Sequence, residues 1–164
     1  MLEKKMIDAL NVQINEELKS AYIYQAMSAD FADKDRPGQT AWMAMQAKEE
    51  VGHAMKIYNY LLSHGAKVEL QTIEAPQSSW SSEEEMFKVA LKHEKFISGC
   101  IKKLVKLAKE IDDTPTEIFL QWFVLEQVEE ESSVEEILAK YAQVGSTANG
   151  LYMLDKELGK RAQS

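Results

Sequence analysis

The sequence contains little cysteine, proline and glycine, with one Cys, three Pro and seven Gly among 164 residues. The single cysteine, Cys100, excludes an internal disulfide and any metal site built mainly from thiolates. Because proline and glycine are scarce, the chain has few breaks, which favours long helices over many short strands. A membrane span needs roughly 20 apolar residues in a row, and no run in the sequence approaches that length. We therefore expect no membrane partner.

The charge balance is acidic, with 27 Asp and Glu against 19 Lys and Arg and a formal net charge of −8. Non-specific nucleic-acid binding needs clustered Lys and Arg, so we expect no nucleic-acid partner. Charges begin at Glu3 and no apolar run follows, so the sequence does not predict a signal peptide. The predicted location is the cytoplasm, and the length fits a single domain over residues 1–164.

Five segments show the periodicity of amphipathic helices. They cover about residues 3–33, 39–63, 82–111, 114–143 and 148–158. A break at Asp35-Arg36-Pro37-Gly38 separates the first two segments. Ser82 and Glu85 form a capping box at the start of the third. Thr114, followed directly by a proline, predicts the N-cap of the fourth.

The lengths of the links predict how these segments are arranged. Short links near residues 34–38 and 112–114 indicate antiparallel helix hairpins. The link over residues 66–81 can extend roughly 50 Å, whereas a helix of about 25 residues is only about 38 Å long. We therefore expect an all-α four-helix bundle over about residues 3–143, made of two antiparallel hairpins with a long crossover. A short C-terminal fifth helix follows it.

A carboxylate interrupts each of the four long apolar stripes. These residues are Glu17, Glu50, Glu94 and Glu130, and His53 lies one turn after Glu50. Burying a lone carboxylate costs several kcal/mol unless a partner compensates, and no Lys or Arg shares the stripes. Their positions along the helices bring all four carboxylates near the middle of the bundle. A multivalent cation would compensate their charges.

The alternative is that the stripes are misphased by one residue and that the carboxylates are solvated. That error would have to occur independently on four helices. His53 alone would more often be a core histidine, but Glu50 and His53 form an i, i+3 pair on one helix face. Carboxylate oxygens with one imidazole suit iron or manganese. The other histidines are predicted as a cap residue, His64, and a surface residue, His93.

Four motifs carry a family resemblance. They are Asn15-Glu16-Glu17-Leu18 with Tyr24, Glu49-Glu50-Val51-Gly52-His53, Glu94, and Glu126-Gln127-Val128-Glu129-Glu130. In this order and at these separations they resemble the non-haem bacterial ferritins, and the resemblance covers essentially the whole chain. Ferritin-like di-iron bundles carry Glu-x-x-His on two helices. In this chain the fourth helix has Gln127 and Glu130 at those two positions, so the second metal would be held by oxygen alone.

The resemblance implies a ferroxidase centre with two irons and a third iron nearby. The residues implied are Glu17, Glu50 and His53 for the first iron, Glu50, Glu94 and Glu130 for the second, Gln127 beside them, and Glu49, Glu126 and Glu129 for the third. Tyr24 and Trp122 lie near such centres and could supply electrons, although both also fit ordinary packing.

The function implied is iron storage. Fe(II) would be oxidised by dioxygen or peroxide and kept as a ferric oxyhydroxide mineral inside a homo-oligomeric cage of 24 subunits. Haem is not expected, because Val51 stands where the haem-binding relatives have methionine. Two other functions stay open: a di-iron oxidase or peroxidase that does not store iron, and a structural cage with an inactive centre. The complete ligand set argues against the inactive cage.

Overall fold

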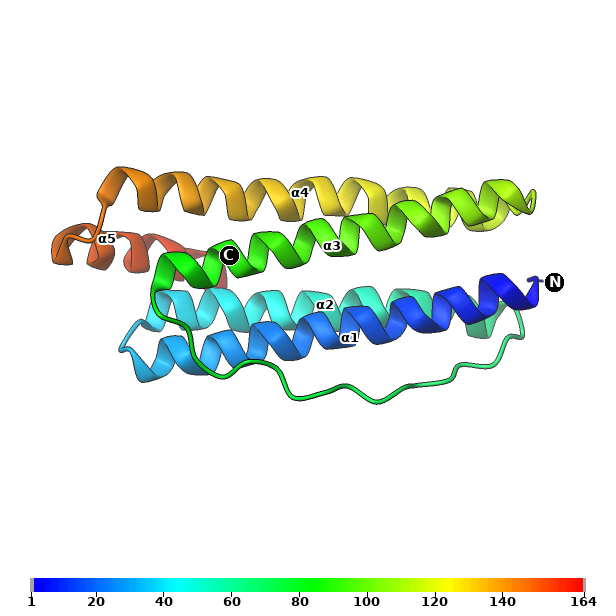
Figure 1. Ribbon diagram of the computed structural model, residues 1–164, viewed down its shortest axis with the longest axis horizontal. Coiled ribbons are helices and arrows are strands. Elements are labelled where there is room, and N and C mark those ends of the chain that lie inside the picture. The colour runs from blue at the N-terminus through cyan, green and yellow to red at the C-terminus, as the bar shows by residue number, and fades with distance from the viewer. Residues whose placement is uncertain (1, 164) are drawn as a thin grey trace.

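The computed structural model describes residues 2–163, and all regular structure in this range is helical (Figure 1). In chain order the elements are α1 (Lys4–Asp33), α2 (Pro37–Ser63), α3 (Glu83–Glu110), α4 (Thr114–Val144), α5 (Ala148–Leu158) and a 3-10 helix, η1 (Gly159–Gln163). The described residues contain no strand. The expected all-α class and the short fifth helix are confirmed.

Two antiparallel hairpins build the bundle, α1 with α2 and α3 with α4 (Figure 1). The segment between α2 and α3 has no regular structure and runs along the outside of the bundle from one end to the other. Because of this crossover, α3 starts at the end of the bundle where α1 turns into α2. The predicted topology is therefore confirmed.

Both hairpin turns contain an aspartate with a left-handed backbone. Asp35 and Asp112 each have φ of 55°, a conformation that aspartate tolerates better than most residues with a Cβ atom. The sequence predicts a turn that includes Pro37 and Gly38 and a second helix from about Gln39, but Pro37 already lies in the first turn of α2. Proline suits that position because its φ is fixed near the helical value and its missing N–H needs no partner there.

The N-cap residue predicted for α3 is confirmed, whereas the one predicted for α4 is not. Ser82 caps α3 as predicted, and its hydroxyl accepts a hydrogen bond from the Glu85 N–H at 3.1 Å. The prediction that Thr114 caps α4 is wrong, because the cap is Asp113, whose carboxylate accepts a hydrogen bond from the Thr116 N–H at 3.1 Å. Asp is as good an N-cap as Thr, and Thr114 lies one residue inside the helix.

The fifth helix docks on the start of α2. The Asp155 carboxylate accepts hydrogen bonds from the backbone N–H groups of Gly38 at 3.2 Å and Gln39 at 2.9 Å. It therefore satisfies two of the helix-end donors that have no partner within α2. The approach is close, since a Cβ atom on Gly38 would lie 1.8 Å from the Asp155 carbonyl oxygen.

The core consists of two apolar clusters. The α5-side cluster includes Met27, Phe31, Trp42, Phe87, Val134 and Tyr141. The N-terminal cluster includes Leu10, Ile14, Ile57, Leu61, Ile101 and Leu104. Along each helix the buried carboxylates fall between residues of these two sets, so a polar layer crosses the middle of the bundle.

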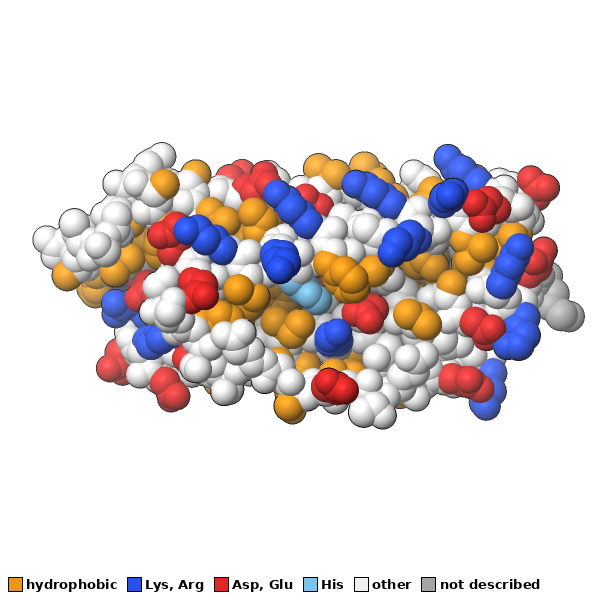
Figure 2. Space-filling view, in the orientation of Figure 1, with side chains coloured by type: hydrophobic (Ala, Val, Ile, Leu, Met, Phe, Trp, Pro, Cys, Tyr) orange, Lys and Arg blue, Asp and Glu red, His pale blue; other side chains and the backbone are white. Residues whose placement is uncertain are grey.

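The outer surface is mixed in charge. On the face shown in Figure 2, Lys and Arg are interspersed with Asp and Glu. None of the described helices is both long enough and apolar enough to cross a membrane.

Candidate metal centre

Every one of the four long helices contributes to the polar layer. The exposed fractions of its members are 1% for Glu17, 1% for Glu50, 5% for His53, 1% for Glu94 and 6% for Glu130. The possibility that the helical stripes are misphased is therefore excluded, because all four carboxylates are buried. We call this set of five side chains the carboxylate layer.

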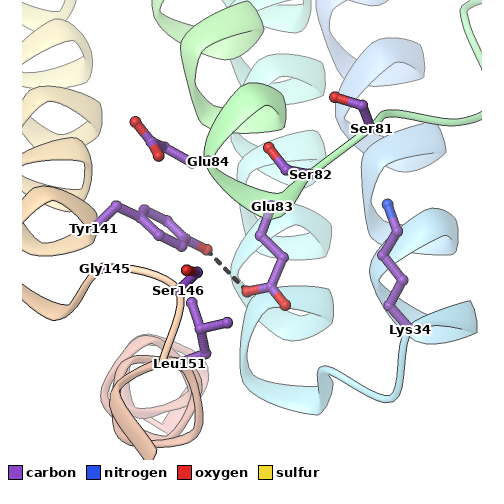
Figure 3. A pocket seen from close by; sticks show the side chains of 9 residues that line it. All are labelled: Lys34, Ser81, Ser82, Glu83, Glu84, Tyr141, Gly145, Ser146 and Leu151. Carbon is purple, nitrogen blue, oxygen red and sulfur yellow. Dashed lines mark hydrogen bonds between the residues drawn. The ribbon is translucent and has the colours of Figure 1, made fainter. Parts of the chain in front are cut away.

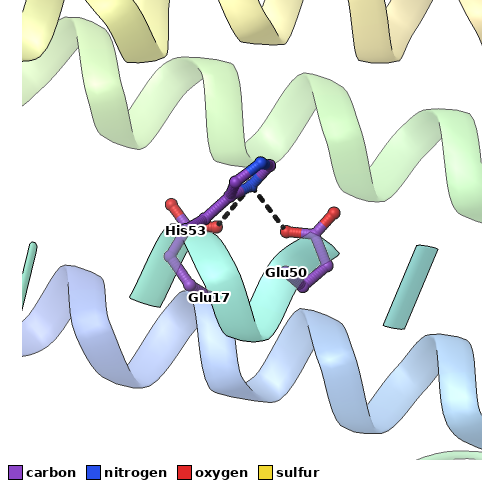
Figure 4. Close-up of side chains that lie close together, drawn as sticks. All are labelled: Glu17, Glu50 and His53. Atoms are coloured by element: carbon purple, nitrogen blue, oxygen red, sulfur yellow. Dashed lines mark ion pairs between the residues drawn. The ribbon is translucent and has the colours of Figure 1, made fainter. Parts of the chain in front are cut away.

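Glu17, Glu50 and His53 lie close together within the layer (Figure 4). The His53 Nδ1 atom lies 3.2 Å from Glu50 Oε2 and 4.0 Å from Glu17 Oε2. Glu17 Oε1 accepts a hydrogen bond from the Gln13 amide at 2.8 Å, whereas the buried Glu17 Oε2 atom has no hydrogen-bond donor. One ligand atom from each of the three residues falls within 4.8 Å of the other two. This group could hold a metal ion.

Glu94 and Glu130 are held by neutral hydrogen-bond donors. The Tyr24 hydroxyl donates to Glu94 Oε1, and the Gln127 amide donates to Glu94 Oε2 at 3.0 Å. A single amide, that of Gln46, donates to both Glu50 at 2.9 Å and Glu130 at 2.8 Å. Neutral donors orient the carboxylates and leave their negative charge for a cation.

The residues predicted for a third iron are only partly brought together. His53 Nε2 lies 3.7 Å from Glu126 Oε1, and His53, Glu126 and Glu130 make a second group that could hold a metal. Glu49 and Glu129 belong to neither group. Glu129 is exposed, and Glu49 is paired with Arg161.

An open hollow adjoins this second group. It is lined by His53, Glu126, Trp122 and Lys56, among others. The Trp122 ring meets the His53 ring edge to face at 5.4 Å, and the Lys56 ammonium lies 4.0 Å from the centre of the indole. The hollow connects the carboxylate layer to solvent on the side of α2 and α4.

The buried carboxylates resist ionisation. Burial, and next the Glu50 carboxylate, raise the pKa of Glu17 to about 8 and that of Glu94 to about 7. Burial followed by the Glu94 and Glu50 carboxylates raises the pKa of Glu130 to about 8. Desolvation lowers the pKa of His53, but the hydrogen bond with Glu50 and the neighbouring carboxylates outweigh it and raise that pKa to about 9. The layer without metal therefore retains protons near neutral pH.

Tyr24 is buried, and its hydroxyl donates a hydrogen bond to Glu94. Burial, then the Glu94 and Glu50 carboxylates, raise its pKa well above the usual value.

The prediction that His93 lies on the surface needs correction, because the ring is only partly exposed and its Nε2 atom lies 2.6 Å from the Ser20 hydroxyl. Its position between α1 and α3 accounts for the burial.

Two glutamines of the site were not predicted from the sequence. Gln13 precedes Glu17 by four residues, and Gln46 precedes Glu50 by four. Residues four apart share one helix face, so the position one turn before each buried carboxylate indicates both glutamines.

A separate pocket lies at the end of the bundle beside α5 (Figure 3). It is lined by Lys34, Glu83, Tyr141 and Leu151, among others. Its central carboxylate, Glu83, is already paired, since it lies 2.6 Å from the Arg36 Nε atom and also accepts a hydrogen bond from Tyr141. These contacts tie the turn between α1 and α2 to α3 and α4, and the pocket contains none of the carboxylate layer.

A four-helix bundle with a long crossover and a buried carboxylate and histidine layer defines a ferritin-like metalloprotein. In agreement, the family model of the Ferritin-like domain matches residues 7–144. The chain belongs to the ferritin family.

Individual relatives match over almost the whole chain. The chain is 39% identical over 158 residues to the bacterial non-heme ferritin of Escherichia coli O6:H1, covering 96% of each protein. It is 40% identical over 162 residues to that of Staphylococcus aureus strain USA300, covering 98% of this chain and 97% of the relative. It also superposes on the open pore ferritin of Archaeoglobus fulgidus with a TM-score of 0.96 at 40% identity, covering 97% and 98% of the two chains. These similarities, together with the group of side chains that could hold a metal, support iron storage.

Proposed function

We propose that this protein is an iron-storage ferritin in which the carboxylate layer is a ferroxidase centre. The observation that carries the proposal is the buried Glu17 Oε2 atom, which has no hydrogen-bond donor and faces His53. A buried carboxylate oxygen without a donor costs free energy. A bound cation removes that cost, and oxygen and imidazole ligands suit iron.

In this proposal the two irons share Glu50. The first iron is held by Glu17, Glu50 and His53, and the second by Glu50, Glu94 and Glu130. Two observations support the shared ligand: Glu50 lies beside His53 on one side and is joined to Glu130 through Gln46 on the other. Gln127 was predicted beside the irons, and its amide donates to Glu94. We therefore assign Gln127 the role of orienting that ligand.

Iron is the substrate of the reaction. Two Fe(II) ions supply two electrons to dioxygen. With four waters the products are two FeO(OH) units, one hydrogen peroxide and four protons. With peroxide as the oxidant, two waters suffice and no peroxide is formed. Because the pKa values of Glu17 and Glu130 are raised to about 8, binding of Fe(II) also releases protons from the layer. Tyr24 is suited to supplying an electron, since its hydroxyl already donates to Glu94.

The ferric product then moves through the hollow beside Trp122 and Glu126. Glu49, Glu126 and Glu129 form the third iron site on that route. One bundle encloses no mineral, so the working unit is an assembly, for which we propose the 24-subunit cage of the family in the cytoplasm.

The competing function is a di-iron oxidase or peroxidase without storage. A single sample distinguishes the two: Fe(II) is added aerobically, the ferric product is followed by absorbance, and particle size is measured by light scattering and electron microscopy. We expect a hollow particle that fills with mineral. A dimer without a cavity would refute storage. Unchanged oxidation by a Glu50→Ala, His53→Ala variant would refute the proposed centre.

A further inference from the structure

The C-terminal 3-10 helix η1 lies against α2 and carries Arg161. The guanidinium donates hydrogen bonds to Glu49 Oε2 at 2.5 Å and to the Gln46 side-chain oxygen at 3.0 Å. It also lies over the Trp42 ring, 4.5 Å from the ring centre. These three partners recur on one face of α2 at spacings of four and three residues, so the contact extends along two helical turns.

The contact with Glu49 concerns a carboxylate that we assign to the third iron. The Glu49 side chain is 40% exposed and that of Arg161 is 28% exposed, so neither is locked in the core. A guanidinium paired with a carboxylate supplies the positive charge that a metal would otherwise supply. Full ligation of iron by Glu49 therefore requires that Arg161 move away.

The contact with Gln46 reaches the carboxylate layer itself. A guanidinium can only donate hydrogen bonds, so it selects the oxygen end of the Gln46 amide. The nitrogen end then points to Glu50 and Glu130, to which it donates at 2.9 and 2.8 Å. Arg161 thus fixes the orientation of the amide that joins two proposed iron ligands.

We propose that Arg161 is a tethered cation that competes with iron for Glu49 and thereby sets the affinity of the third iron site. The inference rests on the proposed function and adds a regulatory role for the C-terminal segment. While the third site is empty, Arg161 neutralises Glu49 and holds Gln46 in place. When Fe(II) binds at Glu49, the guanidinium is displaced and η1 is released from α2. The third site therefore fills after the two sites of the carboxylate layer.

Anaerobic Fe(II) titration of the assembled protein tests the competition. The Arg161→Met variant keeps an apolar side chain over Trp42 and removes the charge, whereas Arg161→Lys keeps the charge. The matched control is Lys160→Met, which removes a charge at the exposed neighbouring residue. A partly exposed ion pair contributes up to about 1 kcal/mol, so we expect Arg161→Met to tighten the third site roughly two- to fivefold. Arg161→Lys and Lys160→Met should stay near the wild-type affinity.

Hydrogen exchange of the C-terminal peptide tests the release. In the wild type, exchange over residues 159–163 should accelerate when the third Fe(II) binds and not when the first two bind. In Arg161→Met, exchange should be fast at every iron level. Equal Fe(II) affinity of the third site in Arg161→Met and Arg161→Lys would overturn the role of Arg161. So would an exchange rate over residues 159–163 that does not change when the third iron binds. A wild type that binds no Fe(II) would instead overturn the proposed function itself.

Discussion

The carboxylate layer and the two apolar clusters are equally buried, yet burial has opposite consequences in them. In the clusters each buried methylene stabilises the fold by about 0.8 kcal/mol. In the layer, burial raises the pKa values of Glu17 and Glu94, so their ionised forms are unfavourable in the folded protein. The clusters therefore supply the stability, and the layer without metal reduces it. The same unfavourable burial is the source of the layer's affinity for cations.

The layer is also distinctive in its supporting hydrogen bonds. Gln13, Gln46, Gln127 and Tyr24, all neutral donors, hold its carboxylates. An Arg or Lys in their place would orient the carboxylates equally well but would neutralise them. A site built from neutral donors keeps both its geometry and its charge ready for iron.

The largest expected effect comes from removing the shared ligand. Glu50→Ala should lower the rate of Fe(II) oxidation at least about 100-fold, the upper range for loss of a supporting metal-site residue, because both irons lose a carboxylate. The measurement is the absorbance of the ferric product after aerobic addition of Fe(II). Particle size should be unchanged. An oxidation rate within a few-fold of the wild type would contradict the shared ligand.

A substitution in an apolar cluster should reduce stability but leave Fe(II) oxidation unchanged, the reverse of what we expect for Glu50→Ala. Leu61 lies fully buried in the N-terminal cluster, two turns beyond His53. Leu61→Ala should reduce the free energy of unfolding by about 2–5 kcal/mol, measured by denaturant titration. The folded fraction should oxidise Fe(II) at the wild-type rate. A loss of oxidation as large as that of Glu50→Ala would remove the distinction between cluster and layer.

The pH dependence of stability provides a third test. Folded Glu17 and Glu130 have pKa values of about 8 and Glu94 of about 7, against a usual value of 4.5, so the folded protein binds more protons than the unfolded one. Their contribution to stability is complete below pH 4.5 and is lost as the pH rises through 7 to 8. His53, with a pKa raised to about 9, acts in the same direction between pH 6.5 and 9.

Metal-free protein should therefore lose on the order of a few kcal/mol of stability between pH 5 and 9. The measurement is the unfolding midpoint across this range, with and without Zn(II) as a redox-inert metal. Zn(II) should abolish most of the loss, and Glu130→Gln should reduce it. Stability that rises with pH in the metal-free protein would be evidence against buried, protonated carboxylates.

The smallest expected effect distinguishes the two iron sites within the layer. The first has an imidazole ligand, His53, whereas the second is held by oxygen alone, so the second iron should bind roughly tenfold more weakly. Anaerobic calorimetry with Fe(II) measures both affinities. Two equally tight sites would show that the imidazole adds nothing.

Periodicity predicted most of the fold and of the centre, because both depend on which helix face a residue occupies. Glu17 and Glu130 stood out as carboxylates at apolar positions, and the structure buries both. The cap of α4 was assigned to Thr114 instead of Asp113, because adjacent residues of similar capping strength cannot be separated without the backbone. The contact of Arg161 with α2 could not be predicted, since it joins residues more than 100 positions apart.

The central claim is that the carboxylate layer binds two irons through a shared Glu50. Its most direct test is anomalous diffraction at the iron edge from crystals loaded with Fe(II) without oxygen. We predict two peaks in the layer, one between Glu17 and His53 and one between Glu94 and Glu130, with Glu50 contacting both. Crystals that show iron on the surface and none among these five residues would contradict the account.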